Sequence, residues 1–562
     1  MSDTSVMRLS WISRQHATFV EPGATVSCSS VYFAALVCAL LVTPAIAADT
    51  TVPDVAYSSI AQLQWRMDAG TLDSRQLTQQ FIDRIQQIDQ SGPSLRAVLE
   101  INPDALKLAA ALDRKRTKAR APLYGIPVLL KDNIDTGDRM LTTAGSLAMI
   151  GAPAPHDAAL VARLRKAGML ILGKSNLSEW ADMRSDHASS GWSGRGGQTR
   201  NPYALDRNPC GSSSGSAAAV AAGLVTAAIG TETDGSIICP ASMNGIVGIK
   251  PTLGLVSRSG IVPISHNQDT AGPLARNVAD AAALLGVIAG SDRHDPATDE
   301  ADRHATDYTR FLDPDGLKGK RIGVVRQLAG SEPNADRVLE QAIATMKAQG
   351  AIIVDPVTLP HLSELGAPES IVLSYDFKHD LNAYLAKRPG LAVKTLADLI
   401  AFNQREATRE MPWFGQQTLE QAEAKGPLTD QAYLDALAKA KQLAGPQGID
   451  AALAKDHLDA LLAPSQGPAF VTDPVLGDHI VSADPNLGGA SQPAAVAGYP
   501  SITVPAGSAH GLPVGIVLFG AKWSEPTLIS VAYGFEQHTH AWQPPKFLST
   551  VNDTTISAAV MP

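Results

Sequence analysis

The stretch PCGSSSGSAAAVAAG, residues 209–223, concentrates hydroxyl groups and glycines in a pattern that could serve three different roles. Gly/Ser-rich stretches form flexible linkers, and glycine loops that open a helix can bind phosphate. Residues 211–215 also match Gly-x-Ser-x-Gly, which would make Ser213 the nucleophile of an α/β-hydrolase. The surrounding residues distinguish these interpretations.

The segment after the loop, Ser216–Val225, is apolar and rich in good helix formers, so a solvated linker is disfavoured. No lysine follows Gly215, as a phosphate-binding P-loop would require. The α/β-hydrolase interpretation needs a buried strand directly upstream, whereas residues 206–210 are polar and contain a proline. It remains an alternative, with the late His538 and His540 as candidate bases for Ser213.

Two other blocks carry groups that could act together with these serines. GIPVLLKDN (125–133) places Lys131 at the end of an apolar strand, and GTETDGSIICPASMNGIVGIKPT (230–252) contains Ser236. Amide cleavage needs a nucleophile, a base that takes its proton and an acid that protonates the leaving amine. Burial would lower the pKa of a lysine and so provide the neutral base. A second serine can accept one proton while donating another.

Together with HNQDTAGPLARNVADAAALL (266–285), AAVAGYPSITVP (494–505) and GLPVGIVLFG (511–520), these blocks resemble the amidase signature family of serine hydrolases. The resemblance covers about residues 55–545. It implies a Ser–cis-Ser–Lys triad in which Ser236 is the acyl-forming nucleophile, Ser212 the bridging serine and Lys131 the base. Gly211 would precede the cis peptide bond, and Ser213 would be a hydrogen-bonding scaffold.

The same resemblance implies how the rest of the site is built. Backbone N–H groups would stabilise the oxyanion, and the residues that supply them are Thr233, Asp234, Gly235 and Ser236. From their residue types, Asp132 and Asn133 are expected to hold their loop. Asp269 with Thr270 could either line the site or hold a turn, and we favour the turn. No metal and no organic cofactor is expected.

The substrate class is suggested by departures from the commonest family pattern. An arginine usually follows the nucleophile by two residues, but here the motif is Asp-Gly-Ser-Ile-Ile (234–238). This motif, NLSEW (176–180) and GWSGRGGQTRNPY (191–203) resemble family members that act on peptide amides. We expect hydrolysis of the C-terminal amide to free acid and ammonia through an acyl-enzyme. The alternatives are a broad-specificity or fatty-acid-type amidase and an esterase that uses Ser213. Two other classes are disfavoured, an exported solute-binding protein and a component of a tRNA amidotransferase.

The N-terminus suggests export. The apolar run at residues 31–47 ends in Ala45-Ile46-Ala47, which is typical of a signal peptide cleaved after Ala47. We therefore expect a leader at 1–47, an amidase at 48–562, and a periplasmic or secreted enzyme without a stable membrane anchor. Two cysteines remain after the leader, Cys210 and Cys239. They either pair or fill the core separately, and we favour the second.

Composition narrows the partners and the fold. The chain has 562 residues, is 45% hydrophobic and carries a net charge of −9, without a basic stripe, so nucleic acid is not an expected partner. We expect a monomer acting on small-molecule or peptide amides. Strand–helix alternation from about residue 125 predicts an α/β fold with a mostly parallel sheet, and residues 360–460 a helical insertion. The family resemblance implies a large mixed sheet covered by helices on both faces, in a single domain.

Overall fold

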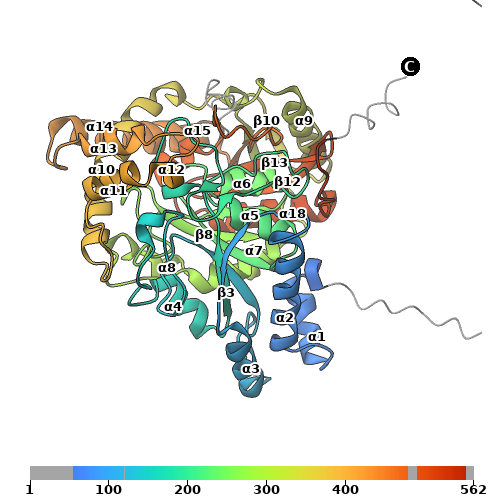
Figure 1. The fold of residues 1–562 in the computed structure, drawn as a ribbon. Coiled ribbons are helices and arrows are strands. Elements are labelled where there is room, and N and C mark those ends of the chain that lie inside the picture. The colour runs from blue at the N-terminus through green and yellow to red at the C-terminus, as the bar shows by residue number, and fades with distance from the viewer. Residues whose placement is uncertain (1–54, 119, 479–489, 552–562) are drawn as a thin grey trace, which may run out of the picture. The chain divides into compact units, whose positions relative to one another are not determined.

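An 11-stranded sheet runs through the part of the chain that the computed structural model describes, residues 55–118, 120–478 and 490–551 (Figure 1). In sheet order its strands are β1 (Val98–Ile101), β3 (Leu170–Ser175), β2 (Pro127–Lys131), β6 (Ala227–Glu232), β8 (Thr270–Ala275), β7 (Val247–Lys250), β12 (Ser501–Ala509), β13 (Leu512–Phe519), β11 (Ala460–Pro464), β9 (Arg321–Val324) and β10 (Ile352–Val354). A separate small hairpin pairs β4 (Trp192–Ser193) with β5 (Gly197–Gln198). The predicted leader lies outside the described residues.

The sheet is mixed, as the family resemblance implied and in contrast to the mostly parallel sheet that the alternation predicted. Strand β2 is parallel to β3 and β6, and β9 is parallel to β10 and β11. The remaining neighbours are antiparallel, including the β12–β13 hairpin. Strands buried on both faces are apolar whatever the direction of their neighbours, so the pattern of apolar residues did not reveal these pairings.

Helices cover both faces of the sheet, which confirms the expected α/β architecture. They are α1 (Ile60–Asp68), α2 (Ser74–Arg84), α3 (Ala105–Lys115), α4 (Ala159–Lys166), α5 (Ser214–Ala221), α6 (Ile238–Met243), α7 (Val278–Ile288), α8 (Ala301–His304), α9 (Pro333–Ala348), α10 (Gly366–Ala386), α11 (Leu396–Arg405), α12 (Ala407–Glu410), α13 (Gln417–Glu423), α14 (Gln431–Ala444), α15 (Asp450–Asp456), α17 (Gln492–Ala497) and α18 (Glu525–Thr539). Within the described residues, no helix is both long and apolar enough to cross a membrane.

The helix starts follow local capping chemistry. Helix α2 begins after Asp73, whose carboxylate accepts a hydrogen bond from the Gln76 amide N–H at 2.7 Å, while the Gln76 side chain accepts from the Asp73 N–H. Pro103 would suit the first position of a helix, but helix α3 begins at Ala105. The Asn102 side chain accepts from the Asp104 N–H at 2.9 Å, and this turn takes up Pro103.

Residues 360–460 are helical as predicted and belong to the same compact unit as the sheet, Pro53–Pro562. Their helices α10, α11, α13 and α14 gather at one side of the unit, in orange in Figure 1. Helix α10 buries Phe377, Leu381 and Leu385 in a cluster that also contains Trp180. The insertion is therefore packed against a segment that comes just before the glycine- and serine-rich loop.

Candidate active site

Strand β2 carries Lys131 into the interior. Every residue of the strand is buried, and Lys131 at its end is 0% exposed. The Lys131 Nζ lies within hydrogen-bond distance of the Ser212 Oγ, at 2.7 Å, and donates to Thr231 Oγ1 at 2.9 Å and to the Thr231 carbonyl at 3.2 Å. The lysine and the proposed bridging serine are thus in direct contact, although 81 residues separate them in the chain.

The environment of Lys131 favours the neutral amine. Burial lowers the pKa of Lys131 to about 7, and the negative charges of Asp182, Asp269 and Glu232 oppose this shift without cancelling it. Desolvation disfavours a cation because the interior cannot replace its hydration. A large fraction of the lysine is consequently available as a base near neutral pH.

The loop before α5 has the backbone that the resemblance implied. The Gly211–Ser212 peptide bond is cis. A Cβ placed on Gly211 would lie 2.2 Å from Ser178 Oγ, so only glycine fits this position. Ser213 donates from Oγ to the Thr231 carbonyl at 3.0 Å, accepts from the Thr231 N–H at 3.2 Å, and donates its own N–H to the Ser236 carbonyl at 3.1 Å. Ser213 therefore links the two loops by hydrogen bonds.

The loop after β6 presents Ser236 with a row of free backbone donors. Among the described residues, no acceptor lies at the N–H groups of residues 233–236. The carboxylate of Glu232 instead accepts from the next two, Ile237 at 2.7 Å and Ile238 at 3.0 Å. Ser236 is 7% exposed, and its hydroxyl makes no hydrogen bond to another described residue. Four unpaired N–H groups beside a free hydroxyl suit an oxyanion site.

A disulfide joins the two loops, Cys210 to Cys239, and corrects the expectation that these cysteines fill the core separately. Cys210 precedes Gly211, and Cys239 follows Ser236 by three residues. Their Cα atoms lie 5.9 Å apart because the chain folds the ends of both loops together. Sequence spacing alone does not reveal that approach.

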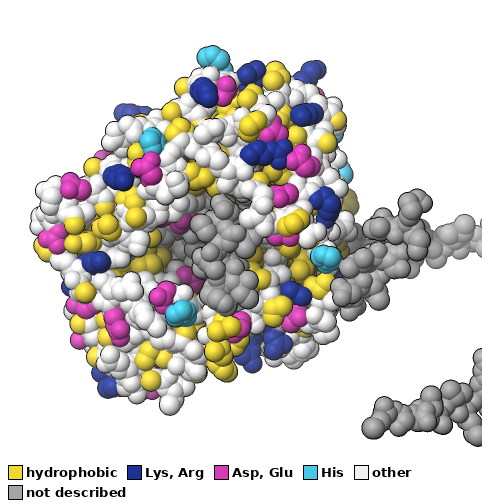
Figure 2. All heavy atoms as spheres, turned by 90° about the horizontal axis from the view of Figure 1, so that it is seen from above, with side chains coloured by type: hydrophobic (Ala, Val, Ile, Leu, Met, Phe, Trp, Pro, Cys, Tyr) yellow, Lys and Arg dark blue, Asp and Glu magenta, His cyan; other side chains and the backbone are white. Residues whose placement is uncertain are grey.

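A cavity of about 360 Å³ opens onto these loops and is lined by Cys210, Gly211, Gly235 and Cys239. Four carboxyl groups also line it, those of Asp182, Asp186, Asp234 and Asp478, whereas no lysine or arginine is among its described lining residues. Burial and the neighbouring Glu369 raise the pKa of Asp234. Figure 2 shows a hollow on one face of the molecule. Acidic and basic side chains are interspersed on the surface around this hollow.

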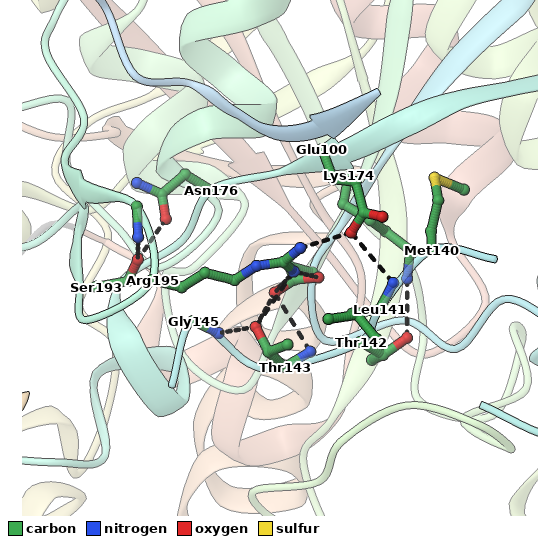
Figure 3. A network of polar contacts seen from close by, with 12 residues as sticks. Glu100, Met140, Leu141, Thr142, Thr143, Gly145, Lys174, Asn176, Ser193 and Arg195 are labelled. Atoms are coloured by element: carbon green, nitrogen blue, oxygen red, sulfur yellow. Dashed lines mark hydrogen bonds and ion pairs between the residues drawn. The ribbon is translucent and has the colours of Figure 1, made fainter. Parts of the chain in front are cut away.

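A polar network surrounds Asp132, the residue that follows β2 (Figure 3). Arg195 donates to Asp132 Oδ1 at 3.1 Å and to Glu100 Oε2 at 2.5 Å. Thr143 donates to the Asp132 carboxylate, and its N–H donates to the Asp132 carbonyl at 3.0 Å. The expectation that Asp132 holds its loop is confirmed. The roles of Arg195 and Glu100 were missed, because an ion pair between residues 95 positions apart leaves no local pattern.

The acid Asp269 holds a turn, as expected, and also reaches the catalytic loop. It accepts from the N–H groups of Ile264 and Ser265 at 2.8 and 2.9 Å, and from Thr233 Oγ1 at 2.6 Å. Helix α10 contributes Glu369, which accepts from Gln268 at 2.8 Å. The same Gln268 amide donates to the Thr233 carbonyl at 3.3 Å, so the helical insertion supports the loop that carries Ser236. The sequence did not indicate this role.

The residues of the α/β-hydrolase alternative are not brought together. His538 and His540 lie at the end of α18, where His538 Nδ1 lies 2.7 Å from the Gly534 carbonyl of the same helix. His540 lines a different cavity, with Tyr57 and Trp542. The hydroxyl of Ser213 instead donates a hydrogen bond to the Thr231 carbonyl in strand β6.

One described group outside the cavity lining has atoms close enough to hold a metal ion: His266, His379 and Asp380, within 4.8 Å of one another. Both imidazoles already contact the Asp380 carboxylate, at 2.9 and 2.8 Å. The three residues lie at the surface between a loop and α10 and contain none of the residues expected to be catalytic.

Comparison with known proteins identifies the family of this fold. The Amidase family profile matches residues 76–529. The chain therefore belongs to the amidase family, and amide hydrolysis is its activity. It is 41% identical over 507 residues to a probable amidase of Arabidopsis thaliana, covering 88% of this chain and 92% of that protein. It is also 36% identical over 523 residues to a putative amidase of Schizosaccharomyces pombe, covering 88% of this chain and 87% of that protein.

Among solved structures, the chain resembles native peptide amidase from Stenotrophomonas maltophilia. The two are 53% identical with a TM-score of 0.81, and the match covers 87% of this chain and 98% of that one. An amidase family protein from Bacillus anthracis is 37% identical, with a TM-score of 0.79 and coverage of 88% and 93%. The family resemblance of the sequence is confirmed.

Proposed function

We propose that this amidase hydrolyses the C-terminal carboxamide of peptide amides to a free acid and ammonia, through a Ser236–Ser212–Lys131 triad. The contact between buried Lys131 and Ser212 is the observation that carries the proposal, because it gives a serine a neutral amine base. The 53% identity to a solved peptide amidase supports the substrate class.

Acylation follows from this arrangement. The Ser236 Oγ attacks the carboxamide carbon while its proton passes to Ser212 Oγ, and the Ser212 proton passes to Lys131 Nζ. The carbonyl oxygen becomes an oxyanion, to which the free N–H groups of residues 233–236 donate. The proton then returns from Lys131 through Ser212 to the nitrogen, the C–N bond breaks, and ammonia leaves an acyl-enzyme on Ser236.

Deacylation uses the same groups in the same order. Water attacks the acyl carbon and gives its proton through Ser212 to Lys131. Collapse of the second oxyanion returns that proton to Ser236 Oγ and releases the acid. Each proton that Lys131 takes is given back within the same half-reaction, so no other acid is needed.

The acidic lining of the cavity distinguishes a neutral substrate from an anionic product. A neutral carboxamide enters a space lined by carboxyl groups, whereas the product carries a carboxylate that the ionised members of this lining, such as Asp182, repel. Release of the acid is thereby favoured. The same repulsion disfavours substrates with an acidic side chain next to the scissile amide.

We also propose that the enzyme works outside the cytoplasm, as a periplasmic or secreted protein. The leader-like pattern at residues 31–47 supports this, and so does the Cys210–Cys239 disulfide, since such bonds persist in oxidising compartments.

The substrate class is tested by ammonia release from a short peptide amide, its N-methylamide and its free-acid form. We expect ammonia from the amide alone and no cleavage of internal bonds by mass spectrometry. Absence of ammonia from the peptide amide, with release from simple aliphatic or fatty-acid amides, would contradict the peptide-amide proposal and favour a broader or fatty-acid-type amidase.

A further inference from the structure

Three consecutive non-glycine residues adopt the left-handed backbone conformation beside the active site. The φ angles of Trp180, Ala181 and Asp182 are 52°, 54° and 73°. Such residues cost of order 1–3 kcal/mol each and persist where the surrounding structure fixes them, which occurs most often at functional sites. Trp180 is 2% exposed, and its backbone N–H donates to the Ala144 carbonyl at 2.9 Å.

This run places the Asp182 carboxylate against the cis-serine loop. A Cβ placed on Gly211 would lie 2.8 Å from Asp182 Oδ2. The next residue, Ser212, contacts Lys131, and its carbonyl accepts from the Ser178 N–H at 3.1 Å. Asp182 also lines the cavity that opens onto Gly211 and Gly235. The carboxylate is thus beside the proton-relay segment rather than elsewhere on the cavity wall.

We propose that Asp182 is a positioning residue of the amidase reaction, which holds the Gly211–Ser212 segment and supplies negative charge beside Lys131 while that lysine carries the Ser236 proton. The inference rests on the proposed function, since it assigns a partner to the base of that triad. The base of a catalytic triad is usually oriented by a third group. Asp182 would be that group for Lys131 and would also offset the positive charge of the protonated amine.

The charges around Lys131 single out Asp182. Three carboxylates raise the pKa of Lys131 against the effect of burial, and Asp182 has the largest effect, followed by Asp269 and Glu232. The other two are engaged elsewhere: Asp269 accepts from Thr233 and two backbone N–H groups, and Glu232 accepts from two backbone N–H groups.

Asp182 itself faces few charges. Burial raises its pKa to about 6, while a Ser178 hydrogen bond and the Lys131 charge lower it. Asp478 is the other acid facing it, and burial raises the pKa of Asp478 to about 7. At neutral pH Asp182 is consequently mostly ionised and able to balance an ammonium ion.

The consequence for catalysis is electrostatic. A proton on Lys131 creates a cation in a fully buried position, which is unfavourable unless an opposite charge is near. Removing the Asp182 charge would destabilise that cation and lower the pKa of Lys131. The pH at which the enzyme gains activity would then move downward, a change that lost packing alone does not produce.

The test is the pH dependence of kcat/KM for a peptide amide with Asp182→Asn. Asparagine has nearly the same shape and tolerates the left-handed conformation. We expect the acid limb of the profile to shift to lower pH by about one unit or more, with a lower kcat. Asp186→Asn is the matched control: it removes an exposed carboxyl of the same cavity, and its limb is expected to stay in place.

An unmoved acid limb in an active, folded Asp182→Asn enzyme would overturn the inference even if kcat fell. The same holds if Asp186→Asn shifts the limb equally. Should the asparagine variant not fold, Asp182→Gly, which suits the positive φ, is expected to show the same shift. Wild-type enzyme that releases no ammonia from any peptide amide would instead contradict the proposed function, so the two failures are distinguishable.

Discussion

The pH dependence of the wild-type enzyme follows directly from the burial of Lys131. The amine acts as a base only when neutral, and its pKa is lowered to about 7 from an ordinary value of 10.5. The activity should therefore increase as the pH rises through about 7 and decrease as the pH falls below it. A lysine of ordinary pKa would instead give activity that still increased near pH 10.

The size of the effect can be worked out from the same value. With a pKa of about 7, the neutral fraction is about 9% at pH 6 and about 91% at pH 8, roughly a tenfold change. An ordinary lysine would be less than about 1% neutral at pH 8. The depressed pKa thus provides more than a hundredfold more base at pH 8 than an exposed lysine would supply.

The assay is ammonia release from a neutral peptide amide at low substrate concentration, from pH 5 to 9.5 at constant ionic strength. The rate then follows kcat/KM, whose acid limb reports the free enzyme. We expect one acid limb with a midpoint near 7. A rate that is constant from pH 5.5 to 8, or a midpoint above pH 9, would refute the argument that burial makes Lys131 the base.

Three further predictions concern the disulfide, the ion pair between Arg195 and Asp132, and the acidic lining of the cavity. Replacing both Cys210 and Cys239 by serine is expected to lower the free energy of unfolding by about 3–4 kcal/mol, given their separation of 29 residues; an unchanged denaturant midpoint would contradict this. Arg195→Met leaves the buried Asp132 without its ion pair and should cost about 3–5 kcal/mol in the same measurement, whereas a loss below about 1 kcal/mol would show that the pair is not structural. Peptide amides ending in lysine should have about tenfold higher kcat/KM than those ending in aspartate, a difference of ~1.4 kcal/mol that shrinks with salt; equal values would show that the acidic lining does not act on substrates.

Much of the site could be predicted because its parts are short and local. The apolar strand ending at Lys131, the strand before Thr233 and the alanine-rich helix after Ser213 are each coded by adjacent residues. Their conjunction identified the family, and the family implied the cis bond at Gly211–Ser212. The capped start of α2 is likewise local, since a capping box spans four residues.

The remaining features depend on contacts between distant parts of the chain. The Cys210–Cys239 bond, the support of Thr233 by Asp269 and the reach of α10 to the catalytic loop arise only when separate elements pack. The left-handed run that presents Asp182 contains no glycine to mark it in the sequence, and its first residue, Trp180, is buried in the fold. Strand directions were hidden for a similar reason: a strand covered on both faces is apolar in either orientation.

The central claim, that Ser236 is the nucleophile, is tested most directly by comparing Ser236→Ala with Ser213→Ala in ammonia release from one peptide amide. The account predicts that the Ser236 variant is folded and inactive, while the Ser213 variant keeps the chemistry with a reduced rate, because it loses hydrogen bonds that join the two loops. Activity that survives in Ser236→Ala and is abolished in Ser213→Ala would contradict the account.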